Sequence, residues 1–337
     1  MRLSLALLPL LCAAASAQTP SRLFLQHEPL TLRLETDLRA LTHDRGTERK
    51  AHAATLHYAA ADTGGSIAVK LRTRGIFRLR TCGFPPIRLD LPVHKVDGTP
   101  FAGEDRLKLV THCQGDRGYE RNLLREYALY RVFNAVTDSS FRVRLAHVTY
   151  IDSVRHDTVT RYGFFVESDA ALGKRIGAQP LTADNVYDPM TDPSYMTLVA
   201  VYQYLIGNTD WSVWKRHNIA LFQQLEQPKP LFAVPYDYDF SGAVNAPYAS
   251  PPEQLKIQSV RQRVYRGFCQ PDSVLQPVLA RFRAAKDSIY AAVRAVPDLP
   301  ERDVRNVLDY FDEFFRMLDN PGAANREFVR ACRPIPR

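Results

Sequence analysis

Several polar residues in the second half of this chain are of the types that phosphoryl transfer requires. Asp210 follows a long apolar segment, Asn218 comes shortly after it, and Asp237 and Asp239 lie further on. Such transfer uses one carboxylate to orient the attacking hydroxyl, and an asparagine and further carboxylates to bind a divalent cation. We therefore predict Asp210 as the catalytic residue and Asn218, Asp237 and Asp239 as ligands of Mg²⁺ or Mn²⁺, which prefer oxygen donors.

The segments around these residues indicate how they are positioned. Residues 194–207 are apolar on nearly all sides and end in Gly207, which predicts a buried helix that delivers Asp210 close to the core. Buried carboxylates are costly unless they are paired or bound to a metal. An extended backbone would direct Asp237 and Asp239 to the same side, and which of them is the main ligand stays open. The alternative is a surface turn rich in Asn and Asp.

A second group of charged residues lies earlier in the chain. Lys108 falls in a predicted strand and Glu126 in the next predicted helix, an arrangement in which the glutamate holds the lysine against nucleotide phosphates. Arg74 lies in a predicted hairpin, and its planar guanidinium suits phosphate oxygens. Glu167 ends a predicted strand and is a candidate contact for adenine or ribose. The alternative is that all four are ordinary surface charges.

The hydrophobic pattern changes along the chain and predicts an α+β fold with two lobes. Alternating apolar residues indicate strands in the first half, with one helix at 119–136, whereas helical spacing dominates the second half. We expect a β-rich N-lobe at 18–167, a mainly helical C-lobe at 168–337, and a ligand cleft between them. The predicted strands are 30–36, 54–58, 66–72, 76–80, 87–91, 106–110, 143–151 and 160–167, and the later helices are 194–207, 275–295 and 301–318.

The first seventeen residues have the character of a signal peptide. A basic Arg2 precedes an apolar stretch, and small residues precede a cleavage site after Ala17. This stretch and every other apolar run are too short to span a bilayer, so we predict no transmembrane segment. The sequence thus predicts an exported protein, periplasmic or secreted.

The cysteines that follow this segment are even in number, which predicts two disulfides in an oxidising compartment. Their pairing stays open, although two of the possible bridges would each remain within one half of the chain. Those two bridges would join Cys82 to Cys113 and Cys269 to Cys332.

The net charge of +8 suits anionic ligands such as nucleotides. The basic residues are scattered, and no known nucleic-acid-binding module or basic stripe with interleaved aromatics occurs, so we do not expect nucleic acid as a partner. The expected partners are a nucleotide and a protein acceptor. No feature of the sequence defines the oligomeric state.

Taken in order, these motifs resemble the spore coat protein H (CotH)-like family of atypical protein kinases over roughly residues 66–242, and part of the order is also similar to HipA-type kinases. The motifs are Arg74-Gly75, Lys108-Leu109-Val110, Glu126, Gly163-Phe164-Phe165-Val166-Glu167, Asn208-x-Asp210, Asn218 and Asp237-x-Asp239. The resemblance implies a two-lobed protein-kinase-like fold that binds ATP and a divalent metal and phosphorylates protein Ser or Thr.

The resemblance also implies roles for individual residues. Asp210 would be the catalytic aspartate, Lys108 and Glu126 would form the nucleotide-binding pair, and Asn218 with Asp237 or Asp239 would hold the metal.

Two departures from the family pattern define alternative functions. The family's Arg-Gly-Asn-Ser element is Arg74-Gly75-Ile76-Phe77 here, and the step from Asp210 to Asn218 is longer than the step usual in kinases. These departures favour a catalytically inactive pseudokinase that acts as a binding or scaffold protein in the envelope. A further alternative is a metal-dependent transferase that uses Asp237 and Asp239 with another donor, such as a nucleotide sugar.

Overall fold

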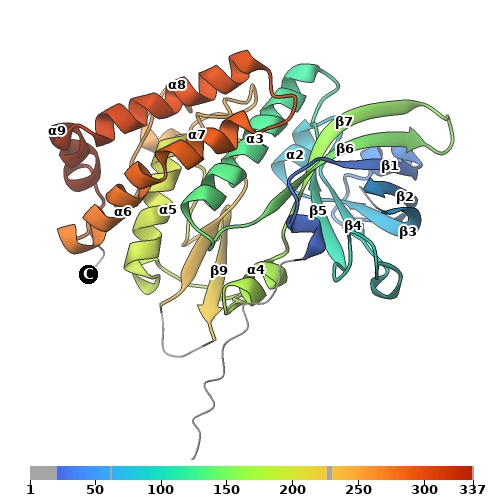
Figure 1. Cartoon of the computed structure of the whole chain (residues 1–337), viewed down its shortest axis with the longest axis horizontal. Helices are drawn as coiled ribbons and strands as arrows, with labels where there is room; N and C mark the ends of the chain where they lie inside the picture. The colour runs from blue at the N-terminus through green and yellow to red at the C-terminus, as the bar shows by residue number, and fades with distance from the viewer. Residues whose placement is uncertain (1–20, 61–62, 226–229, 336–337) are drawn as a thin grey trace, which may run out of the picture.

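Seven strands of the protein close into a barrel (Figure 1). The computed structural model describes residues 21–60, 63–225 and 230–335. Hydrogen bonds join the strands in the order β1-β2-β3-β4-β5-β7-β6, all antiparallel, and β6 then pairs with β1 in parallel and closes the barrel. The strands are β1 (Leu30–Thr36), β2 (His52–Ala60), β3 (Thr63–Thr73), β4 (Ile87–Asp90), β5 (Arg106–Val110), β6 (Val143–Asp152) and β7 (Thr158–Val166).

The alternation of apolar and polar residues explains the inside of the barrel. In β1, Leu30, Leu32 and Leu34 are buried, whereas Thr31 and Arg33 between them are exposed. Alternate side chains of a strand point to the same face, so a strand of this pattern presents its leucines inward. The other strands fill the same core with Leu56, Leu71, Leu89, Leu107, Val148 and Phe165.

The helices of the second half pack together beside the barrel, and α3 lies between them and the barrel (Figure 1). Apolar residues of α3, such as Leu123, Tyr127 and Phe133, share one core with α5 and α8. A small sheet in the order β10-β9-β8 joins this body. The elements are α1 (Leu38–His43), α2 (Phe77–Thr81), α3 (Arg117–Val136), α4 (Asp169–Arg175), β8 (Ala178–Pro180), α5 (Pro193–Ile206), β9 (Ile219–Gln224), β10 (Phe232–Pro235), α6 (Asp272–Ala284), α7 (Lys286–Arg294), α8 (Glu301–Leu318) and α9 (Pro321–Asn325).

The predicted two-lobed kinase-like fold, with a single helix in a β-rich N-lobe, is wrong. The first half contains α1 and α2 besides α3, and its strands form a closed mixed barrel with helices around it. The alternation of apolar and polar residues predicts which side chains of a strand face inward, but it does not predict that the first strand pairs with the sixth. The parallel pairing of β1 with β6 closes the barrel, and it is a contact between distant segments.

Most of the individual elements follow the sequence pattern, with two corrections. The predicted strand at 76–80 is the helix α2, because Gly75 adopts a left-handed backbone (φ +85°) that ends the extended run after β3. The predicted helix at 275–295 is two helices that meet at Ala285. Predictions confirmed to within two residues at each end are the strands 30–36, 54–58, 87–91, 106–110, 143–151 and 160–167 and the helices 119–136, 194–207 and 301–318.

Two disulfides confirm the prediction from the cysteine number, and they fit an exported protein. They join Cys82 to Cys113 and Cys269 to Cys332. The predicted signal peptide, residues 1–17, lies outside the described residues. Within the described ranges, no helix combines the length and apolar character needed to cross a membrane.

Candidate active site

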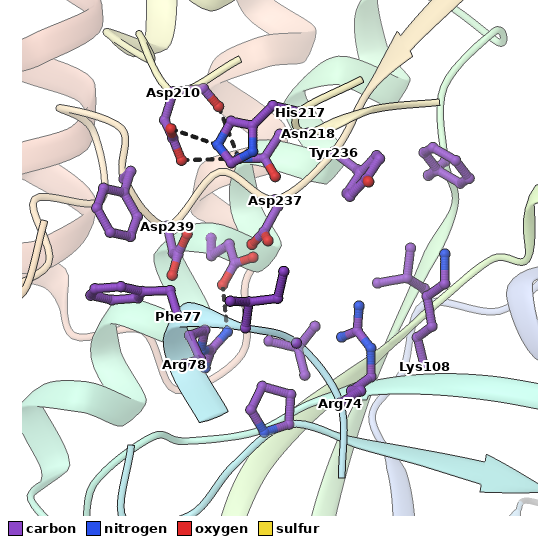
Figure 2. A pocket seen from close by; sticks show the side chains of 18 of the residues that line it. Arg74, Phe77, Arg78, Lys108, Asp210, His217, Asn218, Tyr236, Asp237 and Asp239 are labelled. Atoms are coloured by element: carbon purple, nitrogen blue, oxygen red, sulfur yellow. Dashed lines mark hydrogen bonds and ion pairs between the residues drawn. The ribbon is translucent and has the colours of Figure 1, made fainter. Parts of the chain in front are cut away.

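A cavity of about 460 Å³ lies where one end of the barrel faces the helical body (Figure 2). Its apolar wall includes Ile76, Val110, Phe141 and Val166. Seven of the eight predicted site residues line this one cavity, although they come from distant parts of the chain. They are Arg74, Lys108, Glu126, Asp210, Asn218, Asp237 and Asp239.

The end of α5 fixes the position of Asp210. Gly207 ends the helix in a left-handed conformation (φ +66°), and a Cβ at this position would clash with the hydroxyl of Tyr310. Only glycine fits both requirements. The chain then turns, and the backbone N–H of Asp210 donates to the Asn208 side chain at 3.0 Å. The buried helix therefore delivers this carboxylate to the cavity, as the sequence predicts.

A tight hairpin returns the chain to Asp210. Ser212 and His217 form an antiparallel bridge, which brings His217 and Asn218 beside the carboxylate. His217 Nε2 lies 2.7 Å from Asp210 Oδ1, and the Asn218 amide donates to Asp210 Oδ2 at 3.0 Å. The hydrogen bond that His217 donates to the Asp210 carboxylate raises the pKa of His217 above its usual value, and burial acts in the opposite direction. Both carboxylate oxygens are thus oriented by neighbouring donors (Figure 2).

Asp237 and Asp239 follow β10, but not in the extended conformation that the sequence suggested. Asp237 has a left-handed backbone (φ +63°), and its N–H donates to the hydroxyl of Tyr130 at 2.8 Å. Asp239 is buried, and it accepts a hydrogen bond from Tyr248 at 2.9 Å. Burial and the neighbouring Asp237 raise the pKa of Asp239 to about 7, while Arg78 acts in the opposite direction. Non-glycine residues with left-handed backbone are strained and cluster at functional sites.

Lys108 and Glu126 both line the cavity, but each has another partner. Lys108 forms an ion pair with Asp169 at 3.1 Å, and its ammonium lies 5.7 Å from the ring centre of Tyr236. Glu126 is buried and pairs with Arg78 at 3.6 Å. The pair predicted between Lys108 and Glu126 is therefore replaced by two others. The reason is tertiary, because α2 brings a second cation closer to the glutamate.

Arg74 and Glu167 differ in their location. Arg74 lies at the cavity, where it follows β3 directly, and its guanidinium is drawn close to the open space in Figure 2. Glu167 does not line the cavity: it is buried, pairs with Arg175 at 2.7 Å and accepts from the backbone of Arg142 at 3.0 Å. These contacts tie α4 to the start of β6, which is a structural role.

Sequence reasoning assigned no role to two residues: Arg78, which lines the cavity, and Tyr248, which donates a hydrogen bond to the cavity residue Asp239. Arg78 fell in a segment predicted as a strand, and Tyr248 lies in an irregular region beyond Asp239. Phe77, beside Arg78, packs edge-on against Phe240 with 5.0 Å between ring centres. No local pattern marks these contacts, because they join residues that are far apart in the sequence.

The donor atoms fit a magnesium-type ion better than a metal held by protein alone. Among the described residues, no group of three or more His, Cys, Asp or Glu side chains could hold a metal ion together. Mg²⁺ keeps several waters and is usually bound through one or two carboxylates plus substrate phosphates. Asp237, with the amide oxygen of Asn218, supplies donors of that kind.

No protein-family model and no curated protein matches this chain. The resemblance to CotH-like kinases therefore stays a prediction from short motifs, and the chemistry of the site carries the functional argument.

Proposed function

We propose that this protein is an exported phosphotransferase that uses ATP and a divalent cation, Mg²⁺ or Mn²⁺, to phosphorylate Ser or Thr hydroxyls of a protein acceptor. One observation carries the proposal: a single cavity contains an apolar wall, cationic side chains and an oriented set of carboxylate and amide oxygens. A nucleoside triphosphate with its metal needs these three kinds of surface.

The cavity offers separate places for the parts of a nucleotide. Its volume of about 460 Å³ falls within the usual range for small-molecule sites. The side chains of Ile76, Val110 and Val166 offer an apolar surface to a base. Lys108 and Arg74 supply positive charge for the phosphates, because ammonium and guanidinium groups bind phosphate oxygens with charge-assisted hydrogen bonds.

Asp210 is the proposed catalytic carboxylate. The acceptor hydroxyl oxygen forms a bond to the terminal phosphorus while the bond from that phosphorus to the bridging oxygen breaks, so that ADP leaves. Asp210 orients the hydroxyl and accepts its proton, and His217 and Asn218 hold the carboxylate in place. A bound divalent ion would neutralise phosphate charge and orient the phosphates.

The first test measures the melting temperature of the protein with ATP, with and without Mg²⁺ or Mn²⁺. ATP at a hundredfold excess over its dissociation constant adds about 2.7 kcal/mol of stability. This gain should raise the melting point by about 4 °C, because the unfolding entropy of a chain of this length is roughly 0.7 kcal/mol/K. A metal-dependent shift, followed by transfer of labelled phosphate to a protein acceptor, supports the proposal.

Lys108→Met and Lys70→Met make a matched pair for this test. Lys70 is an exposed lysine of β3, and it does not line the cavity. Loss of a charge-assisted contact costs about 1.5–3 kcal/mol, so Lys108→Met should raise the KM for ATP by about tenfold or more, and Lys70→Met should leave it unchanged.

Other outcomes of the same experiments would favour one of the two alternative functions. Binding of ATP without transfer would favour the pseudokinase alternative, and stabilisation by a nucleotide sugar but not by ATP would favour a transferase with another donor. Either result contradicts the proposed kinase activity.

A further inference from the structure

The structure separates two aspartates that the sequence treats alike. Asp237 lines the cavity and is half-buried, and its side chain makes no hydrogen bond or ion pair within the described ranges. Asp239 also lines the cavity, but only 4 % of its surface is exposed, and its Oδ2 accepts a hydrogen bond from Tyr248. One carboxylate is thus available to a ligand, whereas the other is already engaged by the protein.

The short helix α2 brings a positive charge near Asp239. Arg78 of α2 is buried, its Nη2 donates to the Thr111 carbonyl at 2.5 Å, and its Nη1 lies 3.6 Å from Glu126 Oε2. Glu126 and Asp239 are two buried carboxylates beside this single buried guanidinium, so the charge of Arg78 compensates both. Removal of Arg78 would leave negative charge uncompensated below the cavity.

Aromatic packing holds α2 against the segment that carries the two aspartates, and a disulfide ties the other end of α2 to the chain beyond β5. The ring of Phe77 packs against Phe240, and its centre lies 5.7 Å from that of Tyr248, which is the residue that donates to Asp239. At the other end of α2, Cys82 is bridged to Cys113, just beyond β5. These contacts fix the position of α2, which carries Arg78.

On the side of the cavity opposite Arg78, Asn218 and Asp237 have oxygen atoms that are free to bind a ligand. The Asn218 amide nitrogen donates to Asp210, so its amide oxygen is left for another ligand. Figure 2 shows the ends of the Asn218 and Asp237 side chains in the same open space, with Asp239 set apart toward Arg78 and Phe77. The left-handed backbone of Asp237 and its N–H bond to Tyr130 hold this direction.

From this geometry we infer that Asp237, with the amide oxygen of Asn218, binds the divalent cation, and that Arg78 is a positioning residue that holds Asp239 in a supporting role together with Tyr248. This assignment rests on the proposed function and deepens it. It gives the two carboxylates unequal roles, and it gives a function to α2, whose Arg78 pairs with Glu126.

The test compares how tightly four variants bind Mn²⁺ in the presence of equimolar ADP, followed by the loss of the free-ion electron paramagnetic resonance signal relative to Mn²⁺ and ADP without protein, because the cation is expected to share its ligands between the protein and the phosphates. The variants are Asp237→Asn, Asp239→Asn, Arg78→Lys and Tyr248→Phe. Loss of a direct ligand should weaken Mn²⁺ binding by more than about 100-fold, whereas changes to groups that only support the ligands should cost about tenfold, at the lower end of such effects. We expect the large loss only in Asp237→Asn.

A kinetic readout separates positioning from general structural damage. In Arg78→Lys and Tyr248→Phe, the Mn²⁺ concentration that gives half-maximal transfer should rise, and excess Mn²⁺ should restore the rate while the KM for ATP changes little. Excess Mn²⁺ should not rescue Asp237→Asn. If Arg78→Lys does not fold, Tyr248→Phe carries the same test, because it removes one hydroxyl and leaves the ring contacts in place.

Two results would overturn the assignment. Equal losses of Mn²⁺ affinity in Asp237→Asn and Asp239→Asn would make both aspartates ligands, and unchanged metal dependence in both Arg78→Lys and Tyr248→Phe would remove the positioning role. In either case wild-type binding of Mg²⁺ and ATP would leave the proposed function standing. Failure of the wild-type protein to bind Mn²⁺ or ATP would overturn the proposed function and this assignment together.

Discussion

The interior of the barrel and the floor of the cavity are both buried, but they are built from opposite kinds of residue. The barrel core is made of apolar side chains such as Leu71, Leu89 and Phe165. The floor of the cavity contains Arg78, Glu126 and Asp239, and strained backbone lies beside it.

This difference indicates that the barrel core stabilises the fold and that the floor of the cavity serves binding and catalysis. Apolar burial stabilises a fold, whereas buried charges are costly and strained backbone is seldom kept without a reason. We expect substitutions in the barrel to change the free energy of unfolding. Substitutions at the cavity should instead change binding and rate, and three measurements test that division.

The largest expected effect is the loss of phosphate transfer in Asp210→Asn. Proton transfer by a positioned side chain contributes about 10²–10⁴-fold to a rate, so the initial rate of labelled-phosphate transfer should fall by that factor. Asparagine has nearly the same shape, and the aspartate side chain is partly exposed, so the melting temperature should change little.

Asp309→Asn is the matched control for that measurement, because Asp309 is an exposed residue of α8. Its rate should equal that of the wild-type protein. If Asp210→Asn retains more than about a tenth of the rate, its carboxylate is not the catalytic group.

A substitution that creates an empty space in the barrel core should lower stability and leave ligand binding unchanged. Leu89→Ala removes a fully buried side chain, and such changes cost about 2–5 kcal/mol of unfolding free energy. Urea unfolding should show this loss, while the affinity of the folded protein for Mg²⁺ and ATP stays the same.

Val154→Ala serves as the control for this loss, because Val154 is 66 % exposed in the turn between β6 and β7. Its unfolding free energy should change by less than about 0.5 kcal/mol. A Leu89→Ala protein of normal stability but weakened ATP affinity would contradict the division between the two regions.

The smallest of the three effects is a change of the unfolding free energy with pH, caused by His112 at the end of the barrel. The ring of His112 packs against that of Phe84, which also contacts Tyr150, and burial, with the positive charges of Arg161 and Arg78, lowers the pKa of His112 to about 4. The unfolded chain has a pKa near 6.5 and therefore binds the proton first as the pH falls.

The stability contributed by neutral His112 is therefore present above about pH 6.5 and is lost progressively as the pH falls toward 4, by up to about 3 kcal/mol. Urea unfolding of the wild-type protein and of His112→Gln across this range should give curves that converge at low pH. Subtracting the curves removes the contributions of other titrating groups, and parallel curves would show that His112 does not titrate as stated.

Local periodicity in the sequence determined much of the secondary structure. Alternating leucines mark β1, and the apolar stripe of α8 marks a core-facing helix. The same periodicity misled at 76–80, where alternating residues form α2, because a glycine with a left-handed backbone and contacts to distant segments decide the conformation there.

The sequence by itself also determined which residue types could perform chemistry, and seven of the eight predicted residues line one cavity. Only the tertiary structure decided how they are paired. The partner of Glu126 is Arg78 and not Lys108, and Asp237 and Asp239 face different surroundings.

The same division holds for the fold. The number of cysteines predicted two disulfides, but their pairing is a property of the folded chain, as is the parallel contact of β1 with β6 that closes the barrel. A sequence pattern records the burial of each residue within its own helix or strand. Which strands, charges and cysteines meet depends on contacts between distant segments, and the packing of the whole chain selects among them.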